Sequence, residues 1–124
     1  FDDNNVIYAH SMKNGTMFGT LKKVIESSYR SNSENMIISY DTLFGKYKFK
    51  IFSVYKVDYT TDYLKTNFDS EKDFNEFVKL IKSRSVFKSK DKVKYGDKIL
   101  TLSTCTGNNN RRLVVHAVLI KEEK

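Results

Sequence analysis

Short apolar stretches separated by turn signals recur along the chain, and they predict most of its regular structure. Five of them are interpreted as β-strands: 4–9, 36–40, 46–57, 97–104 and 113–120. Stretch 46–57 alternates, with lysines on one face, so the other face is expected to carry Tyr47, Phe49, Ile51, Ser53, Tyr55 and Val57. We expect this strand to form a hairpin with its predecessor across the turn at 41–46.

Two further stretches have the spacing of amphipathic helices. Thr16 is expected to cap the first, which ends near 31–33 and carries Met17, Phe18, Leu21, Val24 and Ile25. Ser70, with Asp73 three residues later, is expected to begin the second, which runs to about Ser83 and buries Phe74, Phe77, Val78 and Ile81. Strands outnumber helices and most connections are short, which predicts a mostly antiparallel sheet or barrel with two helices on its outside.

The composition fits one folded domain over residues 1–124, without internal repeats or a linker. An apolar fraction of 40% with eight Tyr and nine Phe excludes a disordered chain. One Cys excludes an internal disulfide framework and a Cys-based zinc finger. No spacing of His or carboxylates suggests a metal site, and the glycines form no phosphate-binding loop, so no metal or cofactor is expected.

The net charge of +7 leaves several classes of partner open. The densest basic stretch, 79–98, could attract nucleic acid or an anionic polymer, or it could be a solvated lysine-rich face. Only four Arg are present, and a base-reading surface would be expected to hold more. The chain starts at Phe1, without Met and without a signal-like leader, so we expect it to be an incomplete gene product; the sequence leaves open whether a targeting or anchoring segment precedes it.

Cys105 is the first candidate for chemistry. It follows the apolar run 99–104, where a strand gives way to a polar turn, and a strand end is a rigid place to present a nucleophile. The alternative is a buried cysteine that acts as a small apolar residue. Only a thiolate is a good nucleophile, so a catalytic role requires a partner that transfers protons or stabilises the charge.

His10 is the better of two candidates for that proton transfer. It follows the first predicted strand and precedes a turn, so it can lie at the rim of the sheet. His116 lies within the last strand, four residues and ~13 Å from Arg112. If Arg112 lies near Cys105, His116 is too far from the thiol, and it is then interpreted as a satisfied or rim-facing sheet histidine.

Arg111 and Arg112 close the turn that Cys105 opens. A tight connection would bring the start of the last strand back beside the thiol, where a guanidinium could donate hydrogen bonds to an oxyanion. The alternative is a solvated pair of hairpin arginines. Adjacent strand residues point to opposite faces, so only one of the two can serve.

These residues together resemble those of a known family. The run Thr101-Leu102-Ser103-Thr104-Cys105, with Arg112 seven residues later before an aliphatic strand, resembles the active-site signature of sortases. Residues 6–18 are similar to the catalytic-histidine segment of class B sortases, although Ala9 stands where that class usually has Gly. The predicted helix 70–83 looks like the extra helix of class B. The resemblance extends over nearly the whole chain.

The resemblance implies a sortase-type β-barrel, mostly antiparallel, and an extracellular, membrane-anchored cysteine transpeptidase of a Gram-positive bacterium. Cys105 would form a thioacyl-enzyme on the Thr of a C-terminal sorting signal of the Asn-Pro-x-Thr-Asn or -Gly kind. His10 would transfer protons, and Arg112, which directly precedes the aliphatic run, would hold the substrate and stabilise the oxyanion. A peptidoglycan amine would resolve the intermediate. By the same resemblance, Ser103, Tyr63 and Thr104 match positions near the sorting-signal groove.

One departure qualifies the resemblance. The family barrel has strands before the catalytic histidine that this sequence does not supply, so we expect a sortase domain without its front portion. We therefore do not predict activity for these 124 residues alone. The runner-up interpretation is a basic, non-catalytic module for an anionic polymer or nucleic acid. A third is a fold that has lost activity, suggested by Ala9, which restricts the backbone more than Gly.

Overall fold

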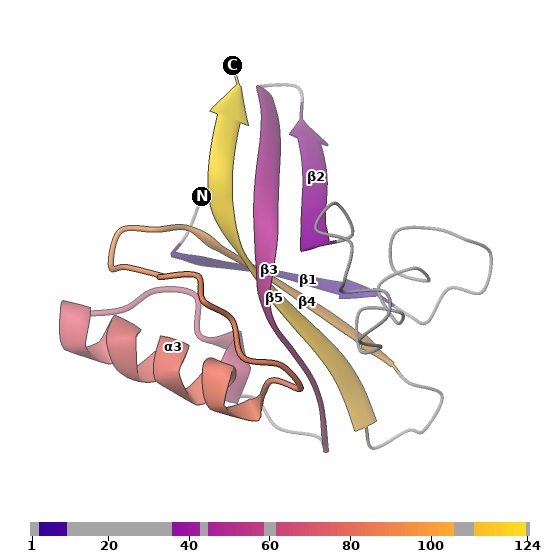
Figure 1. Cartoon of the computed structure of the whole chain (residues 1–124), viewed down its shortest axis with the longest axis vertical. Coiled ribbons are helices and arrows are strands. Elements are labelled where there is room, and N and C mark those ends of the chain that lie inside the picture. Colours follow the sequence, from indigo (N-terminus) through magenta and orange to yellow (C-terminus); the bar gives the residue numbers. More distant parts are fainter. Residues whose placement is uncertain (1–2, 10–35, 43–44, 59–61, 106–110, 124) are drawn as a thin grey trace.

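A computed structural model describes residues 3–9, 36–42, 45–58, 62–105 and 111–123. They form one five-stranded sheet (Figure 1), with the strands β1 (Asn4–Ala9), β2 (Ile37–Thr42), β3 (Gly45–Asp58), β4 (Ile99–Cys105) and β5 (Arg111–Glu123). All five predicted strands are confirmed, each within three residues of its expected bounds. The helix predicted to begin at Thr16 lies outside the described residues.

The strand order in the sheet is β1-β4-β5-β3-β2. β2 with β3, β3 with β5 and β4 with β5 are antiparallel, which confirms the mostly antiparallel prediction and the 36–57 hairpin. β1 and β4 are parallel, although about ninety residues of sequence separate them. Within the described residues the sheet is open, with β1 and β2 as its edge strands. The parallel pair brings the carboxyl ends of β1 and β4 to the same end of the sheet.

A bulge interrupts β3 and corrects one expectation. The register of β3 on β5 shifts between Ile51, which pairs with Ala117, and Ser53, which pairs with His116. One extra residue, Phe52, therefore moves every later side chain to the opposite face. Ile51 packs in one core and Tyr55 in the other. The prediction that 47–57 share one face is therefore wrong beyond Ile51.

The sheet buries apolar side chains on both faces. One core contains Phe49, Ile51, Val54, Leu102 and Val115. The other lies beneath helix α3 (Glu71–Arg84), which Figure 1 shows beside the sheet, and its sheet residues include Phe52, Tyr55, Ile99, Val114 and Val118. The predicted stripe of α3 is confirmed as buried: Phe74, Phe77, Val78 and Ile81.

Helix α3 begins where the capping signal predicts. Ser70 has an extended backbone, and its Oγ accepts a hydrogen bond of 3.2 Å from the Asp73 N–H. Two acidic residues lie in the first turn and two basic residues in the last, each sign at the helix end that favours it. Ser53 Oγ donates to the Ile81 carbonyl at 2.6 Å and so joins the helix to the bulged part of β3.

Candidate functional site

The segments that carry the predicted catalytic residues meet at one end of the sheet. β4 ends at Cys105, and in the backbone register Cys105 pairs with Arg112 of β5. On the β3 side, Arg112 pairs with Val57 and Arg111 pairs with Asp58. The register thus brings Cys105 and Arg112 opposite each other in adjacent strands, with Arg111 one residue earlier in β5.

His10 lies outside the described residues, but the strand that precedes it ends beside the strand that carries Cys105. β1 ends at Ala9, which pairs with Thr104, the residue before Cys105. Because β1 and β4 run in the same direction, the sequence reaches His10 and Cys105 from strands that end side by side. Thr104, a predicted substrate-binding residue, pairs with Leu113 on its other side.

His116 lies away from this end of the sheet. It pairs with Thr101, four residues before Cys105, and it is fully buried. Its Nδ1 lies 2.8 Å from Thr101 Oγ1 and its Nε2 2.9 Å from Tyr55 Oη. Burial, together with the positive charge of Arg84, lowers the pKa of His116 to about 3. His116 is therefore a satisfied, neutral core histidine, one of the two kinds of sheet histidine expected for it.

Two of the predicted substrate-binding residues contact each other. Tyr63 lies in the short 3-10 helix η3 (Asp62–Leu64), and its Oη is 3.0 Å from Ser103 Oγ. Both residues are only 3% exposed. Ser103 precedes Cys105 by two residues in β4. This hydrogen bond therefore holds η3 next to the end of β4, where Cys105 lies. The segment predicted as a loop at 58–67 thus contains a helical turn.

Sequence reasoning missed a buried set of polar side chains that crosses the sheet. Tyr55, His116, Thr101 and Asn4 lie on four different strands and are at most 2% exposed. Thr101 Oγ1 donates to Asn4 Oδ1 at 2.6 Å, which continues the contacts of His116. A sequence signal exists for Thr101 and His116, each a single polar residue inside an apolar strand, but it does not say which side chains they contact. We call these four residues the His116 network.

Some basic side chains, including several of the 79–98 stretch, form hydrogen bonds or ion pairs with other residues of the chain. Lys82 Nζ donates to the Asp91 carbonyl at 2.6 Å, and Lys50 forms an ion pair of 2.9 Å with the carboxylate of the same residue. Arg84 forms a bidentate ion pair with Asp62. These contacts give Lys82 and Arg84 of the 79–98 stretch, and Lys50 outside it, a structural role, whereas lysines 88, 90, 92 and 94 are exposed.

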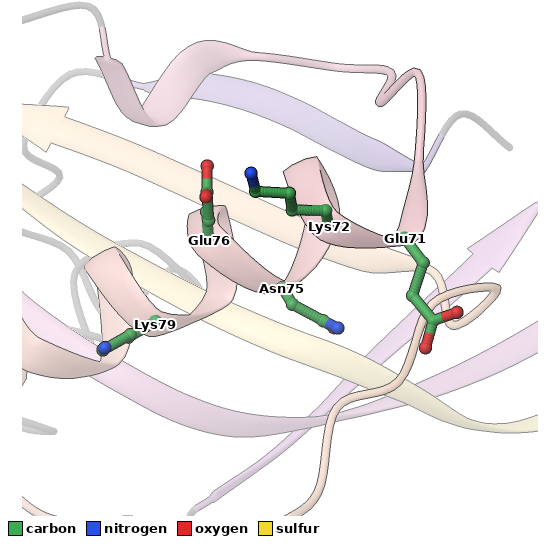
Figure 2. Close-up of a pocket in the computed structure, with 5 residues that line it drawn as sticks. All are labelled: Glu71, Lys72, Asn75, Glu76 and Lys79. Carbon is green, nitrogen blue, oxygen red and sulfur yellow. The ribbon is translucent and has the colours of Figure 1, made fainter.

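The outer side of α3 carries an open surface depression (Figure 2). Its lining residues all come from this one helix: Glu71, Lys72, Asn75, Glu76 and Lys79. They mix both signs of charge, and none of the predicted site residues lies among them. Among the described residues, no group of three or more His, Cys, Asp or Glu could hold a metal ion. None of the helices described is both long and apolar enough to cross a membrane.

Comparison with known proteins gives consistent results. The sequence matches the family model described as "Sortase domain" over residues 2–120. It is 34% identical to Sortase B of Staphylococcus aureus over 95% of this chain, and 35% identical to Sortase B of Listeria monocytogenes over 96%. The match covers 49% of each relative, so the chain spans about half the length of these curated relatives.

The fold also matches a solved structure. The Staphylococcus aureus sortase B–substrate complex superposes with a TM-score of 0.85 at 33% sequence identity. The match covers 97% of this chain and 56% of that one. Fold and sequence therefore point to the same family.

Proposed function

Because this chain belongs to the sortase family and matches its class B members, we propose that it carries the cysteine transpeptidase site of a class B sortase. The observation that supports this most strongly is the strand register at one end of the sheet. It pairs Cys105 with Arg112 and brings the end of β1, immediately before His10, beside the end of β4. These are the three residues that the family resemblance assigns to catalysis.

The proposed reaction has two acyl-transfer steps. The Cys105 thiolate attacks the Thr carbonyl carbon of a sorting signal, the peptide C–N bond breaks, and the leaving amine takes a proton from the His10 imidazolium. An acceptor amine then attacks the thioester, gives its proton to His10 and releases the thiolate. The product is a new amide bond. In both steps the Arg112 guanidinium donates hydrogen bonds to the oxyanion that forms.

We assign substrate contact to Tyr63, Ser103 and Thr104. The Tyr63–Ser103 hydrogen bond supports this because it places the two predicted residues together, two residues from the proposed nucleophile. The Staphylococcus aureus relative has been solved with its substrate, and a peptide sorting signal of the Asn-Pro-x-Thr-Asn or -Gly kind is the proposed substrate here. The proposed acceptor is a peptidoglycan amine. The proposed location is the outer face of a Gram-positive cell membrane.

The test is cleavage of a fluorogenic sorting-signal peptide by the intact protein. We expect Cys105→Ala to lower kcat/KM by at least about 1,000-fold, because the thiolate has no substitute. Asn75→Ala, on the outer side of α3, is the control and should match the wild type. Cleavage by Cys105→Ala at the wild-type rate would overturn the proposal. Salt-dependent polymer binding that alkylation of Cys105 leaves unchanged, without any turnover, would support the basic-module alternative instead.

The two adjacent arginines provide a matched pair for the same assay. Arg112→Ala is expected to lower kcat/KM by about 100-fold or more, as loss of an oxyanion donor does in other acyl-transfer enzymes. Arg111→Ala removes the same charge one residue away, at the position that pairs with Asp58, and should have a much smaller effect. Equal losses in the two variants would contradict the role given to Arg112.

A further inference from the structure

The direction of every hydrogen bond in the His116 network can be derived from one amide group. Asn4 Nδ2 lies 2.9 Å from the carbonyl oxygen of Lys65 and 3.4 Å from that of Tyr63. Carbonyl oxygens only accept, so the amide nitrogen must face them, and Asn4 Oδ1 must face the opposite way. Asn4 Oδ1, also an acceptor only, lies 2.6 Å from Thr101 Oγ1. The Thr101 hydroxyl proton is therefore donated to Asn4.

This assignment determines the tautomer of His116. The Thr101 hydroxyl has no second proton, so its oxygen must accept from His116 Nδ1, 2.8 Å away. His116 then carries its proton on Nδ1, and in the neutral ring Nε2 is an acceptor. The Tyr55 hydroxyl, 2.9 Å from Nε2, must be the donor. The protons thus point one way, from Tyr55 through His116 and Thr101 to Asn4.

Both ends of this series reach the same short segment of the chain. At one end, Asn4 Nδ2 donates to the carbonyls of Tyr63 and Lys65, and the Asn4 backbone N–H donates to the Thr66 carbonyl at 2.9 Å. At the other end, the guanidinium carbon of Arg84 lies 5.8 Å from the centre of the Tyr55 ring. Arg84 forms the bidentate ion pair with Asp62. Segment 62–66 is therefore held at its start and at its end.

The groups around His116 favour a single protonation state. The rings of Phe52, Phe77 and Tyr63 lie within 6.4 Å of its ring, ring centre to ring centre. The charged group facing it through Tyr55 is the Arg84 cation, which opposes a second positive charge. An imidazolium would also remove the Nε2 acceptor of the Tyr55 hydroxyl proton, and the neighbouring Arg84 guanidinium only donates. A charged ring in this core would lack a compensating partner.

We infer that His116 is a positioning residue. Neutral and protonated on Nδ1, it connects the two ends of a series of hydrogen bonds whose protons all point in the same direction. This series holds segment 62–66, and with it Tyr63, against Ser103. The inference rests on the proposed function only where it treats Tyr63 as part of the substrate site. His116 does not touch the proposed reacting atoms. It acts through Thr101, Asn4 and Tyr55, and so belongs to the framework behind the site.

The first test is nitrogen-15 NMR of the His116 ring in the intact protein. We expect one ring nitrogen, Nδ1, to carry a directly bonded proton and Nε2 to carry none, unchanged between neutral pH and about pH 5. A proton on Nε2, or an imidazolium at neutral pH, would overturn the assignment. This measurement needs no substrate, so it decides the inference even if the protein cleaves no sorting signal.

The second test uses Thr101, where one hydroxyl joins two links of the network. Thr101→Val keeps the shape but removes the hydroxyl, and it should increase hydrogen exchange of segment 62–66. It should also raise KM for the sorting-signal peptide about 3- to 10-fold, the equivalent of about one hydrogen bond, with kcat within about twofold. Thr101→Ser should restore both values. Unchanged exchange of segment 62–66 in Thr101→Val would overturn the inference.

Ser53→Ala is the matched control. Ser53 is also fully buried, and its hydroxyl donates to the Ile81 carbonyl, outside the His116 network. Its loss should lower stability but leave the His116 tautomer, the exchange of segment 62–66 and KM unchanged. Equal changes in Ser53→Ala and Thr101→Val would mean that lower stability alone explains them, and would contradict a positioning role.

Discussion

At the scale of single residues, His116 shows how burial and hydrogen bonding set the chemistry of a side chain. The residue type most often considered for proton transfer is here enclosed in the core, with both ring nitrogens occupied by Thr101 and Tyr55. Burial, with the charge of Arg84, lowers the pKa of His116 to about 3. His10, the other histidine of the chain, is therefore the residue for which we propose proton transfer.

The lowered pKa predicts acid sensitivity. The unfolded chain protonates His116 near pH 6.5, whereas the folded protein resists protonation down to about pH 3. The contribution of neutral His116 is therefore complete above about pH 6.5 and is lost as the pH falls, by up to about 1.4 kcal/mol per pH unit. By about pH 4.5 the free energy of unfolding should have fallen by about 2–3 kcal/mol from this residue alone.

Urea unfolding of the wild type and His116→Gln, at neutral pH and at about pH 4.5, checks this. The variant is expected to be less stable at neutral pH but to lose about 2–3 kcal/mol less on acidification, because glutamine does not titrate. Other titrating groups contribute equally to both proteins and cancel in the difference. The same acid-induced loss in both proteins would show that His116 is not held neutral.

The sequence pattern places Cys105 and Arg112 near strand ends, and the structure confirms those positions, while their catalytic roles stay a proposal. The pattern was uninformative for the His116 network. Thr101 and His116 are single polar residues within apolar runs, whereas Asn4 lies in the polar run at the start of the first strand. Asn4 and Thr101 are 97 residues apart in sequence, and Thr101 and His116 are 15 apart. Their contact depends on the pairing of β1 with β4 and of β4 with β5, which no local pattern encodes.

At the scale of elements, the apolar pattern predicts the strands well because one or both faces of each are buried. It fails at the β3 bulge, because the extra residue Phe52 puts Ser53 on the α3 side of the sheet and not on the side of Ile51. A bulge adds one residue to the strand, and Ile51 and Phe52 both suit a strand, so nothing in the composition marks it. The long alternation of lysines before it encouraged the prediction of a single face.

The capping of α3 by Ser70 can be tested by substitution. Ser70→Ala removes the side chain that accepts from the Asp73 N–H and should lower the free energy of unfolding by about 1 kcal/mol. Ser83→Ala in the last turn is the control, since its hydroxyl only donates to the Leu80 carbonyl and alanine favours a helix. Urea unfolding followed by circular dichroism compares them. A loss in Ser70→Ala no greater than in Ser83→Ala would contradict the capping role.

At the scale of the whole molecule, the sheet topology assembles the candidate site. Antiparallel pairing of β4 and β5 follows from a short connection, and the sequence predicts it. Parallel pairing of β1 with β4 does not follow, because the strands are distant in sequence and parallel pairing needs a long crossover. That pairing is nevertheless what places the end of β1, next to His10, beside the end of β4.

The contacts of the basic side chains also change the interpretation of the +7 charge, which by itself leaves nucleic acid open as a partner. Lys82, Arg84 and Lys98 contact carboxylates or carbonyls within the chain, which is a structural use of the basic stretch. The remaining exposed lysines suit a protein that works near an anionic cell envelope, as proposed here. Turnover of a sorting signal by the intact protein would exclude both the basic-module and the inactive-fold interpretations.

Acylation of Cys105 by a sorting signal can be observed by mass spectrometry of the intact protein after incubation with a sorting-signal peptide in the absence of an acceptor amine. We expect a mass increase from the acyl group of the fragment that ends in Thr, equal to the mass of the fragment acid less one water. The adduct should be located on Cys105 by digestion and released by hydroxylamine, as a thioester is. An adduct on another residue, or peptide cleavage in the Cys105→Ala variant, would contradict it.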